Sequence, residues 1–236
     1  MKGLTKGSGN LMAASAVLVL SLFLSKAEES HFYLKGDLGG SWIGDVTGTV
    51  KGAGVLQEEF GSGVPVRARF HPGVRVGMTC GYEFTDWFAA EAELGGVLNE
   101  VEQGSLVSGS RAALGPDTRI ANVPLLFNAR FQYPNSSHWR PYIGAGLGVS
   151  ASIMDGVLFA RSANFNAYYR QEIRDADAVL AYHAFAGLRY RLNDRMGLQV
   201  EYRYLVTESP EWGDFLAIGF RRIETHAFSL AFDYHF

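Results

Sequence analysis

THAFSLAFDYHF, residues Thr225–Phe236, is the stretch that decides the fold. Large apolar or aromatic side chains stand at alternate positions, and small or polar side chains stand between them. The apolar set is Phe228, Leu230, Phe232, Tyr234 and Phe236. In a helix, with 100° between successive residues, these five would scatter around the cylinder, whereas at 180° they form one face. The stretch therefore predicts a β-strand with one apolar face.

Seven earlier segments show the same alternation and predict seven more strands. In one of them, Val74–Phe84, apolar residues alternate with Gly, Arg and Thr. Pro124, Leu126 and Phe185 are exceptions, because they fall on faces that are otherwise polar. Segments of about 9–11 residues have the length that a tilted strand needs to cross hydrocarbon. The seven are Phe32–Trp42, Val74–Phe84, Phe88–Leu98, Ala121–Tyr133, Pro141–Val149, Leu180–Leu192 and Leu198–Tyr204.

The connections between these segments alternate in length. Short turns are expected at residues 85–87, 134–140 and 193–196. Long connections rich in Gly, Ser and charge are expected near 45–70, 99–120, 150–178 and 205–222. Short turns at one end and long loops at the other are typical of an outer-membrane barrel with both chain ends in the periplasm.

The N-terminus has the pattern of an export signal. Lys2 and Lys6 precede an apolar run at residues 11–24, and small residues in Ser25–Ala27 mark a cleavage site after Ala27. The alternative is a transmembrane anchor, but this run of 14 residues is shorter than the roughly 20 that a spanning helix needs. We therefore expect a signal peptide at residues 1–27 and a barrel at residues 28–236.

Composition agrees with an exported β-protein. The chain has 28 Gly and 13% aromatic residues, which favour strands joined by tight turns. Its single Cys80 cannot form an internal disulfide. The formal net charge is −3 and no basic run is present, so nucleic acid is not expected as a partner.

Alternation alone does not say which face is outside, because a soluble lipocalin-like barrel has the same pattern reversed. The charges of the polar faces decide in favour of a membrane barrel, because six bases balance six acids, and buried charges persist when they are paired. Aromatic residues near the strand ends of the other face fit the girdles at a lipid–water boundary. We therefore predict an all-β protein, an eight-stranded antiparallel up-and-down transmembrane barrel with a charge network in its lumen. The network residues are Lys35, Asp37, Arg75, Glu83, Glu91, Glu93, Arg130, Arg189, Arg191, Glu201, Arg203 and Asp233.

Two further motifs, RPYIGAGLG at Arg140–Gly148 and AGLRYRLND at Ala186–Asp194, accompany the aromatic final strand. With them, the chain resembles the small outer-membrane barrels of the OmpA/OmpX and opacity type, which are porin-like in architecture. The resemblance implies outer-membrane lipid and lipopolysaccharide, the barrel-assembly machinery and periplasmic chaperones as partners. It also implies that the final strand carries the barrel-assembly signal, at Phe228, Leu230, Phe232, Tyr234 and Phe236.

Catalysis is not expected. A site like that of a lipid A deacylase needs a His and a Ser two residues apart on the lipid face. Here His226 is followed two residues later by Phe228, and Ser229 belongs to the other face. Asp233, His235 and His183 have the chemistry of metal ligands, but hydrogen bonding in the lumen explains them more simply. We expect no catalytic residues, no cofactor and no metal.

The predicted role is structural or adhesive, with the long loops free to contact a host or another surface ligand. Arg161, Arg170 and Arg174 in the third long loop could meet lipopolysaccharide phosphates, although neighbouring acids favour a solvated mixed-charge loop. Two alternatives stay open, a narrow porin for ions or small solutes and a surface enzyme acting on lipid A or peptides.

Overall fold

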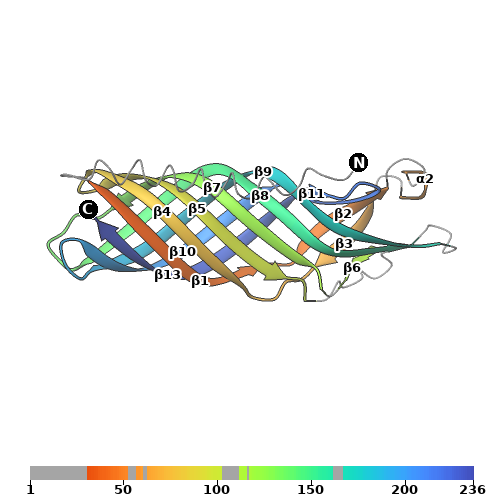
Figure 1. The fold of residues 1–236 in the computed structure, drawn as a ribbon, viewed down its shortest axis with the longest axis horizontal. Helices are drawn as coiled ribbons and strands as arrows, with labels where there is room; N and C mark the ends of the chain where they lie inside the picture. Colours follow the sequence, from red (N-terminus) through yellow and green to blue (C-terminus); the bar gives the residue numbers. More distant parts are fainter. Residues whose placement is uncertain (1–30, 53–56, 61–62, 103–111, 116, 162–166) are drawn as a thin grey trace, which may run out of the picture.

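The computed structural model describes residues 31–52, 57–60, 63–102, 112–115, 117–161 and 167–236 (Figure 1). The predicted signal peptide, residues 1–27, lies outside the described residues. Among these residues, one short helix is present, α2 (Gln57–Phe60). Within the described ranges, no helix has the length and apolar character needed to cross a membrane.

Eight long strands form a closed antiparallel barrel, which confirms the predicted fold class. Each strand pairs with the next one, β13 pairs back onto β1, and β8 pairs with β9. A row of paired residues can be followed around the barrel from Gly40 in either direction. In one direction it reaches β9 at Ala186, and in the other it reaches β9 at Ala176, ten residues away. This offset tilts the strands as Figure 1 shows. The strands are β1 (Phe32–Ile43), β4 (Gly73–Thr85), β5 (Phe88–Glu100), β7 (Arg119–Gln132), β8 (Trp139–Arg161), β9 (Tyr168–Arg191), β10 (Met196–Glu208) and β13 (Arg222–His235).

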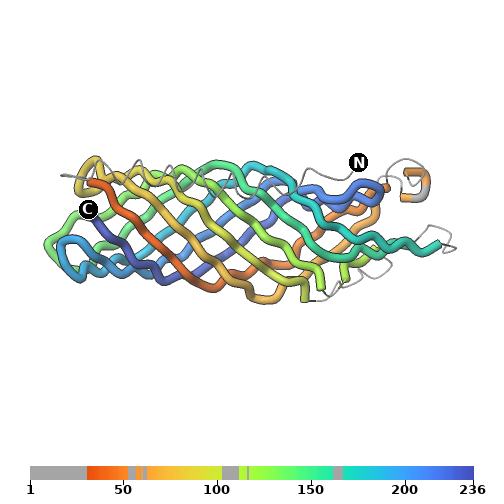
Figure 2. The backbone as a smooth tube through the Cα atoms, in the orientation of Figure 1, coloured from red at the N-terminus to blue at the C-terminus, as the bar shows by residue number. Residues whose placement is uncertain are grey.

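The two ends of the barrel differ, as the tube in Figure 2 shows. The short turns, the start of β1 and the end of β13 lie together at one end, which is the periplasmic end of an outer-membrane barrel. There the amide of Phe236 donates to the carbonyl of Phe32, 3.1 Å away. The opposite, extracellular end is much longer than the sequence predicted.

The long connections contain strands where loops were expected. The first and last of them hold β2 (Val46–Gly52), β3 (Val64–Ala68), β11 (Glu211–Trp212) and β12 (Leu216–Phe220), which pair in the order β11-β12-β2-β3. The second holds β6 (Ala112–Leu114), which pairs with β8. In the third, β8 and β9 simply continue, to 23 and 24 residues. The barrel wall therefore extends well above the membrane.

At one level of the barrel, the inward-facing side chains of four wall strands change from odd-numbered to even-numbered residues. Odd-numbered side chains point inward in β1, β4, β10 and β13, whereas even-numbered ones point inward in β2, β3, β11 and β12. A break of this kind re-aims the side chains that follow it. The breaks hold Pro72 and Pro210, which lack a donor for the ladder, and Ser209 with a positive φ of 46°. Strands β5, β7, β8 and β9 run through this level without such a change.

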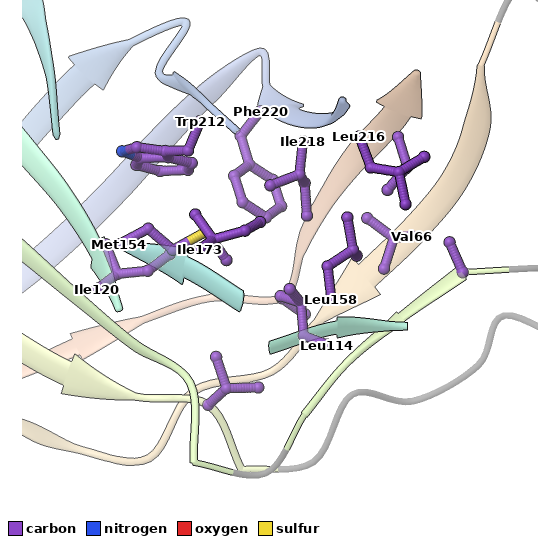
Figure 3. Packing of buried hydrophobic residues seen from close by; sticks show 14 of the residues in the cluster. Val66, Leu114, Ile120, Met154, Leu158, Ile173, Trp212, Leu216, Ile218 and Phe220 are labelled. Carbon is purple, nitrogen blue, oxygen red and sulfur yellow. The ribbon is translucent and has the colours of Figure 1, made fainter. Parts of the chain in front are cut away.

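The polarity of the barrel interior reverses above the breaks. In the lower barrel, charged residues are buried inside and apolar residues are exposed outside, as a lipid environment requires. In the upper barrel the inside is an apolar core, to which β8, β9, β11 and β12 all contribute (Figure 3).

Candidate functional site

The lumen of the lower barrel holds the charged residues that the sequence singled out. Ten of the twelve are buried there, five bases against five acids: Lys35, Arg75, Arg130, Arg189 and Arg203, and Asp37, Glu91, Glu93, Glu201 and Asp233. The other two, Glu83 and Arg191, lie near the periplasmic end and are partly exposed.

Glu93 on β5 lies at the centre of this network, between two guanidinium groups. Arg203 Nη1 lies 2.5 and 2.6 Å from the two Glu93 oxygens, and Arg75 Nη2 lies 2.8 Å from Oε1. Arg75 Nε also donates to Asp37, 3.0 Å away, and Arg203 pairs with Glu201. These bonds join four strands, so no carboxylate at the centre is left without a positive partner.

Two tyrosines each donate to an acid two strands away around the barrel. The Tyr33 hydroxyl donates to Glu91 at 2.5 Å, and the Tyr142 hydroxyl donates to Glu201 at 2.9 Å. Arg130 lies between them, donating to the Tyr33 oxygen at 3.3 Å and stacking 4.2 Å above the Tyr142 ring. The planar guanidinium therefore combines a hydrogen bond with a cation–π contact.

The apolar residues that interrupt the polar faces fill space within the network. Phe185 is buried, with Lys35 Nζ 5.7 Å and the Arg203 guanidinium carbon 5.2 Å from its ring centre. Lys35 also bonds Glu201 at 3.2 Å. Leu126 is completely buried in a small cluster just above. The exceptions in the sequence pattern are therefore packing elements of the lumen.

Histidine and aspartate near the lumen take part in hydrogen bonding. His183 Nε2 lies 2.7 Å from Asn128 Oδ1, and its Nδ1 lies 2.6 Å from Arg203 Nη1. Because Arg203 donates, this ring carries its proton on Nε2. Asp233 accepts from Arg189 at 2.5 Å, and His235 Nε2 lies 3.0 Å from it. Across the described ranges, no three His, Cys, Asp or Glu side chains are grouped so that they could hold a metal ion.

Glycines leave the room that these long side chains occupy. A Cβ on Gly146 would stand 2.8 Å from His183 Nε2 and collide with the Asn128 side chain. A Cβ on Gly197 would stand 2.6 Å from Arg189 Nε and 2.7 Å from Asp233 Oδ1. An eight-stranded lumen is only just wide enough for its side chains, so the network depends on these positions.

A second barrier, which sequence reasoning missed, closes the extracellular end. Trp212 is buried there and donates its Nε1–H to the Ser152 carbonyl, 2.7 Å away. The signal was present in the alternation of Leu216, Ile218 and Phe220, which lies in a connection read as a loop. We call this cluster the apolar plug; its buried members are Ile43, Val50, Phe60, Val64, Val66, Ala68, Phe70, Val101, Ala112, Leu114, Ile120, Met154, Leu158, Ala160, Ile173, Trp212, Leu216, Ile218, Phe220 and Ile223.

The outward face of the last strand carries the predicted assembly residues. Phe228, Leu230 and Phe232 are exposed, and Tyr234 and Phe236 are half-buried against each other with ring centres 5.3 Å apart. All five lie on the lipid-facing side of β13 and its end, opposite the lumen.

Comparisons with known proteins agree with this architecture. The family model described as outer membrane protein beta-barrel domain matches residues 12–236. The outer membrane protein OprG from Pseudomonas aeruginosa is 17% identical, with a TM-score of 0.55 over 87% of this chain and 96% of that one. Neisserial surface protein A is 14% identical, with a TM-score of 0.49 over 88% of this chain and 98% of that one. No curated protein matches the sequence.

Proposed function

Because the chain belongs to the outer membrane protein β-barrel family, and so resides in the bacterial outer membrane, we propose that it is a sealed barrel with a structural and surface-contact role. Its lower wall contacts outer-membrane lipid. Its extended upper wall is available to a ligand on a host cell or on another surface.

The observation that carries the proposal is the double closure of the lumen. Ten paired charges cross the lower barrel, and the apolar plug fills the upper one. An ion entering from outside would first have to displace a packed hydrophobic core, in which voids larger than a water molecule are rare. It would then meet carboxylates and guanidinium groups that already neutralise one another. Both features support a closed barrel over the narrow pore.

The upper wall supports the surface-contact role. Its outward face carries exposed ion pairs, such as Arg174–Asp155 at 3.1 Å and Arg170–Glu172 at 3.0 Å. Tyr168 and Phe215 are also among its most exposed side chains. A rigid sheet that displays charges and isolated aromatic rings suits contact with a polar partner surface.

Biogenesis is part of the same proposal. Residues 1–27 would direct export, and periplasmic chaperones would then carry the unfolded chain. The barrel-assembly machinery would read Phe228, Leu230, Phe232, Tyr234 and Phe236. Their common outward face supports this role, because it would be open to a receptor before lipid covers it.

Planar-bilayer recording tests the sealed barrel. The purified protein should insert without producing conductance steps, while a general porin handled in the same way should give them. Steps in the wild type that disappear when Arg75 or Glu91 is replaced would establish the pore instead. Insertion is checked by the heat-modifiable gel mobility that compact barrels show.

A further inference from the structure

A group of polar side chains interrupts the lipid-facing surface of β9, β10 and β13. Each member has the outward parity of its strand; His226, for instance, stands between the buried Thr225 and Ala227. We call this group the outer-wall cluster. Its members are Tyr182, Tyr202, Tyr204, Glu208, Arg222, Glu224 and His226.

The members are bonded to one another but remain open on the outside. Arg222 pairs with Glu224 at 2.6 Å, and Tyr204 bonds the same carboxylate. The Tyr182 hydroxyl donates to Glu208 at 2.8 Å. The side chains of Arg222 and Glu224 are nevertheless 54% and 36% exposed. Their remaining donors and acceptors are therefore accessible from the lipid side.

Tyr202 and His226 form the lower part of the cluster. The Tyr202 hydroxyl lies 2.7 Å from His226 Nδ1. Trp42 of β1 stacks on the His226 ring, with centres 5.8 Å apart and planes 9° apart, and is itself half-exposed. The cluster therefore ends in flat aromatic surface that faces outward.

The cluster lies at the extracellular boundary of the lipid-facing wall. Toward the periplasm, the next outward residues are Phe228 and Leu230 on β13 and Val200 on β10, all exposed and apolar. On the extracellular side, β13 begins at Arg222, next to the break at Arg221. A molecule covering the cluster and the surface below it would need a polar head and apolar chains. The position of the cluster at the extracellular end assigns it to the outer leaflet.

We propose that the outer-wall cluster binds the headgroup of an acylated, phosphorylated amino sugar of the lipid A class. Arg222 supplies a guanidinium for phosphate. Glu208 and Glu224 are acceptors, which suit sugar hydroxyl and amide groups. The Trp42 ring offers a face for the C–H groups of a sugar ring. A phosphoglycerol headgroup would use Arg222 but has no sugar ring for Trp42 and no amide group for Glu208 and Glu224.

Native mass spectrometry of the folded protein in an amine-oxide detergent tests this, with lipid A and phosphatidylglycerol as separate probes. The variants are Arg222→Gln and His226→Phe. The control is Arg119→Gln. Arg119 is an outward arginine of similar exposure that lies away from the cluster, and its Nε is 3.0 Å from Glu100 Oε1. Heat-modifiable mobility confirms that each variant is folded.

Wild type should bind lipid A more tightly than phosphatidylglycerol. Arg222→Gln should weaken lipid A binding about tenfold, the effect of losing one charged hydrogen bond. His226→Phe should also weaken it, and Arg119→Gln should bind as wild type does. Equal binding of the two lipids, wild-type binding by both cluster variants, or the same loss in Arg119→Gln would overturn the proposal. The outer-wall cluster does not depend on the sealed lumen. Planar-bilayer conductance tests whether the lumen is sealed, and lipid binding tests the cluster, so the two proposals can fail separately.

Discussion

Arg203 on β10 and Glu93 on β5 form an ion pair across the full width of the barrel. Nη1 of Arg203 lies 2.5 and 2.6 Å from the two carboxylate oxygens. In the strand order, β5 and β10 are separated by three strands on either side, so they stand opposite one another. The pair therefore joins walls that share no backbone hydrogen bond.

Breaking this pair on one side should destabilise the barrel strongly. Arg203→Met leaves Glu93 with Arg75 as its remaining guanidinium partner, and removing one partner of a buried pair costs about 3–5 kcal/mol. Unfolding by urea in detergent micelles measures the loss.

The double variant Glu93→Gln/Arg203→Met is the matched control. It removes both charges and should recover part of the lost stability, because the Glu93 carboxylate that lost Arg203 is gone, while Glu201 keeps Lys35 at 3.2 Å. A double variant whose stability equals the plain sum of the two single losses would show that the pair is not coupled.

The sequence predicted the lower barrel well because one physical rule governs it. Lipid outside and a packed polar lumen inside give strict alternation, so segments such as Phe88–Leu98 closely match β5. The network residues follow from the same parity. Which base would meet which acid could not be predicted, because partners such as Arg203 and Glu93 are 110 positions apart and meet only through barrel closure.

The strands of the upper barrel were not predicted, because the alternation of lipid-facing apolar residues with polar residues of the lumen ends at the membrane boundary. On the upper part of β8, apolar side chains occur on both faces: Met154 and Leu158 point inward, and Val157 and Phe159 point outward. Alternation is therefore not visible there. In β12 it is visible, but the parity change at Arg221 separates it from β13.

Gly146 should be intolerant of a side chain. In Gly146→Ala, the new methyl group would stand 2.8 Å from His183 Nε2 and from the Phe127 carbonyl oxygen. Overpacking of this kind costs about 1–3 kcal/mol, which urea unfolding would detect. Gly36→Ala is the control, because nothing lies within 4 Å of its Cβ position. Equal stability of the two variants would contradict a tightly filled lumen.

Trp212 should stabilise the upper wall locally. Trp212→Ala removes a buried ring worth about 3–5 kcal/mol, so amide hydrogen exchange should accelerate in β11, β12 and β2. The lower strands should keep their protection, because the charge network is untouched. Trp212→Phe keeps most of the ring but leaves the Ser152 carbonyl without its 2.7 Å donor, so an intermediate effect is expected. Faster exchange throughout β1 and β13 would show instead that the two halves unfold together.

Phe236 should matter more for assembly in the cell than for stability. Phe236→Ala is expected to lower the folded, heat-modifiable fraction in the outer membrane several-fold, because the predicted assembly signal would lose one of its five aromatic or apolar residues. Purified Phe236→Ala should refold into detergent as wild type does. Phe215→Ala, at an exposed position between β11 and β12, is the control and should assemble normally. Poor refolding of Phe236→Ala in detergent would point to a stability defect and not to recognition.

The parity change at Arg221 should be essential to the upper wall. Deleting this one residue would draw β12 one position along β2. Leu216, Ile218 and Phe220 would then stand opposite Lys51, Thr49 and Thr47, whose side chains point outward, and would turn outward with them. Each such side chain is worth about 1.5–3 kcal/mol when buried, so hydrogen-exchange protection of β12 should fall at least about tenfold. Arg221→Ala keeps the residue count and the backbone carbonyl that accepts from Ser209 at 2.9 Å, so it should leave protection unchanged. If the substitution and the deletion behave alike, the side chain and not the register holds the plug in place.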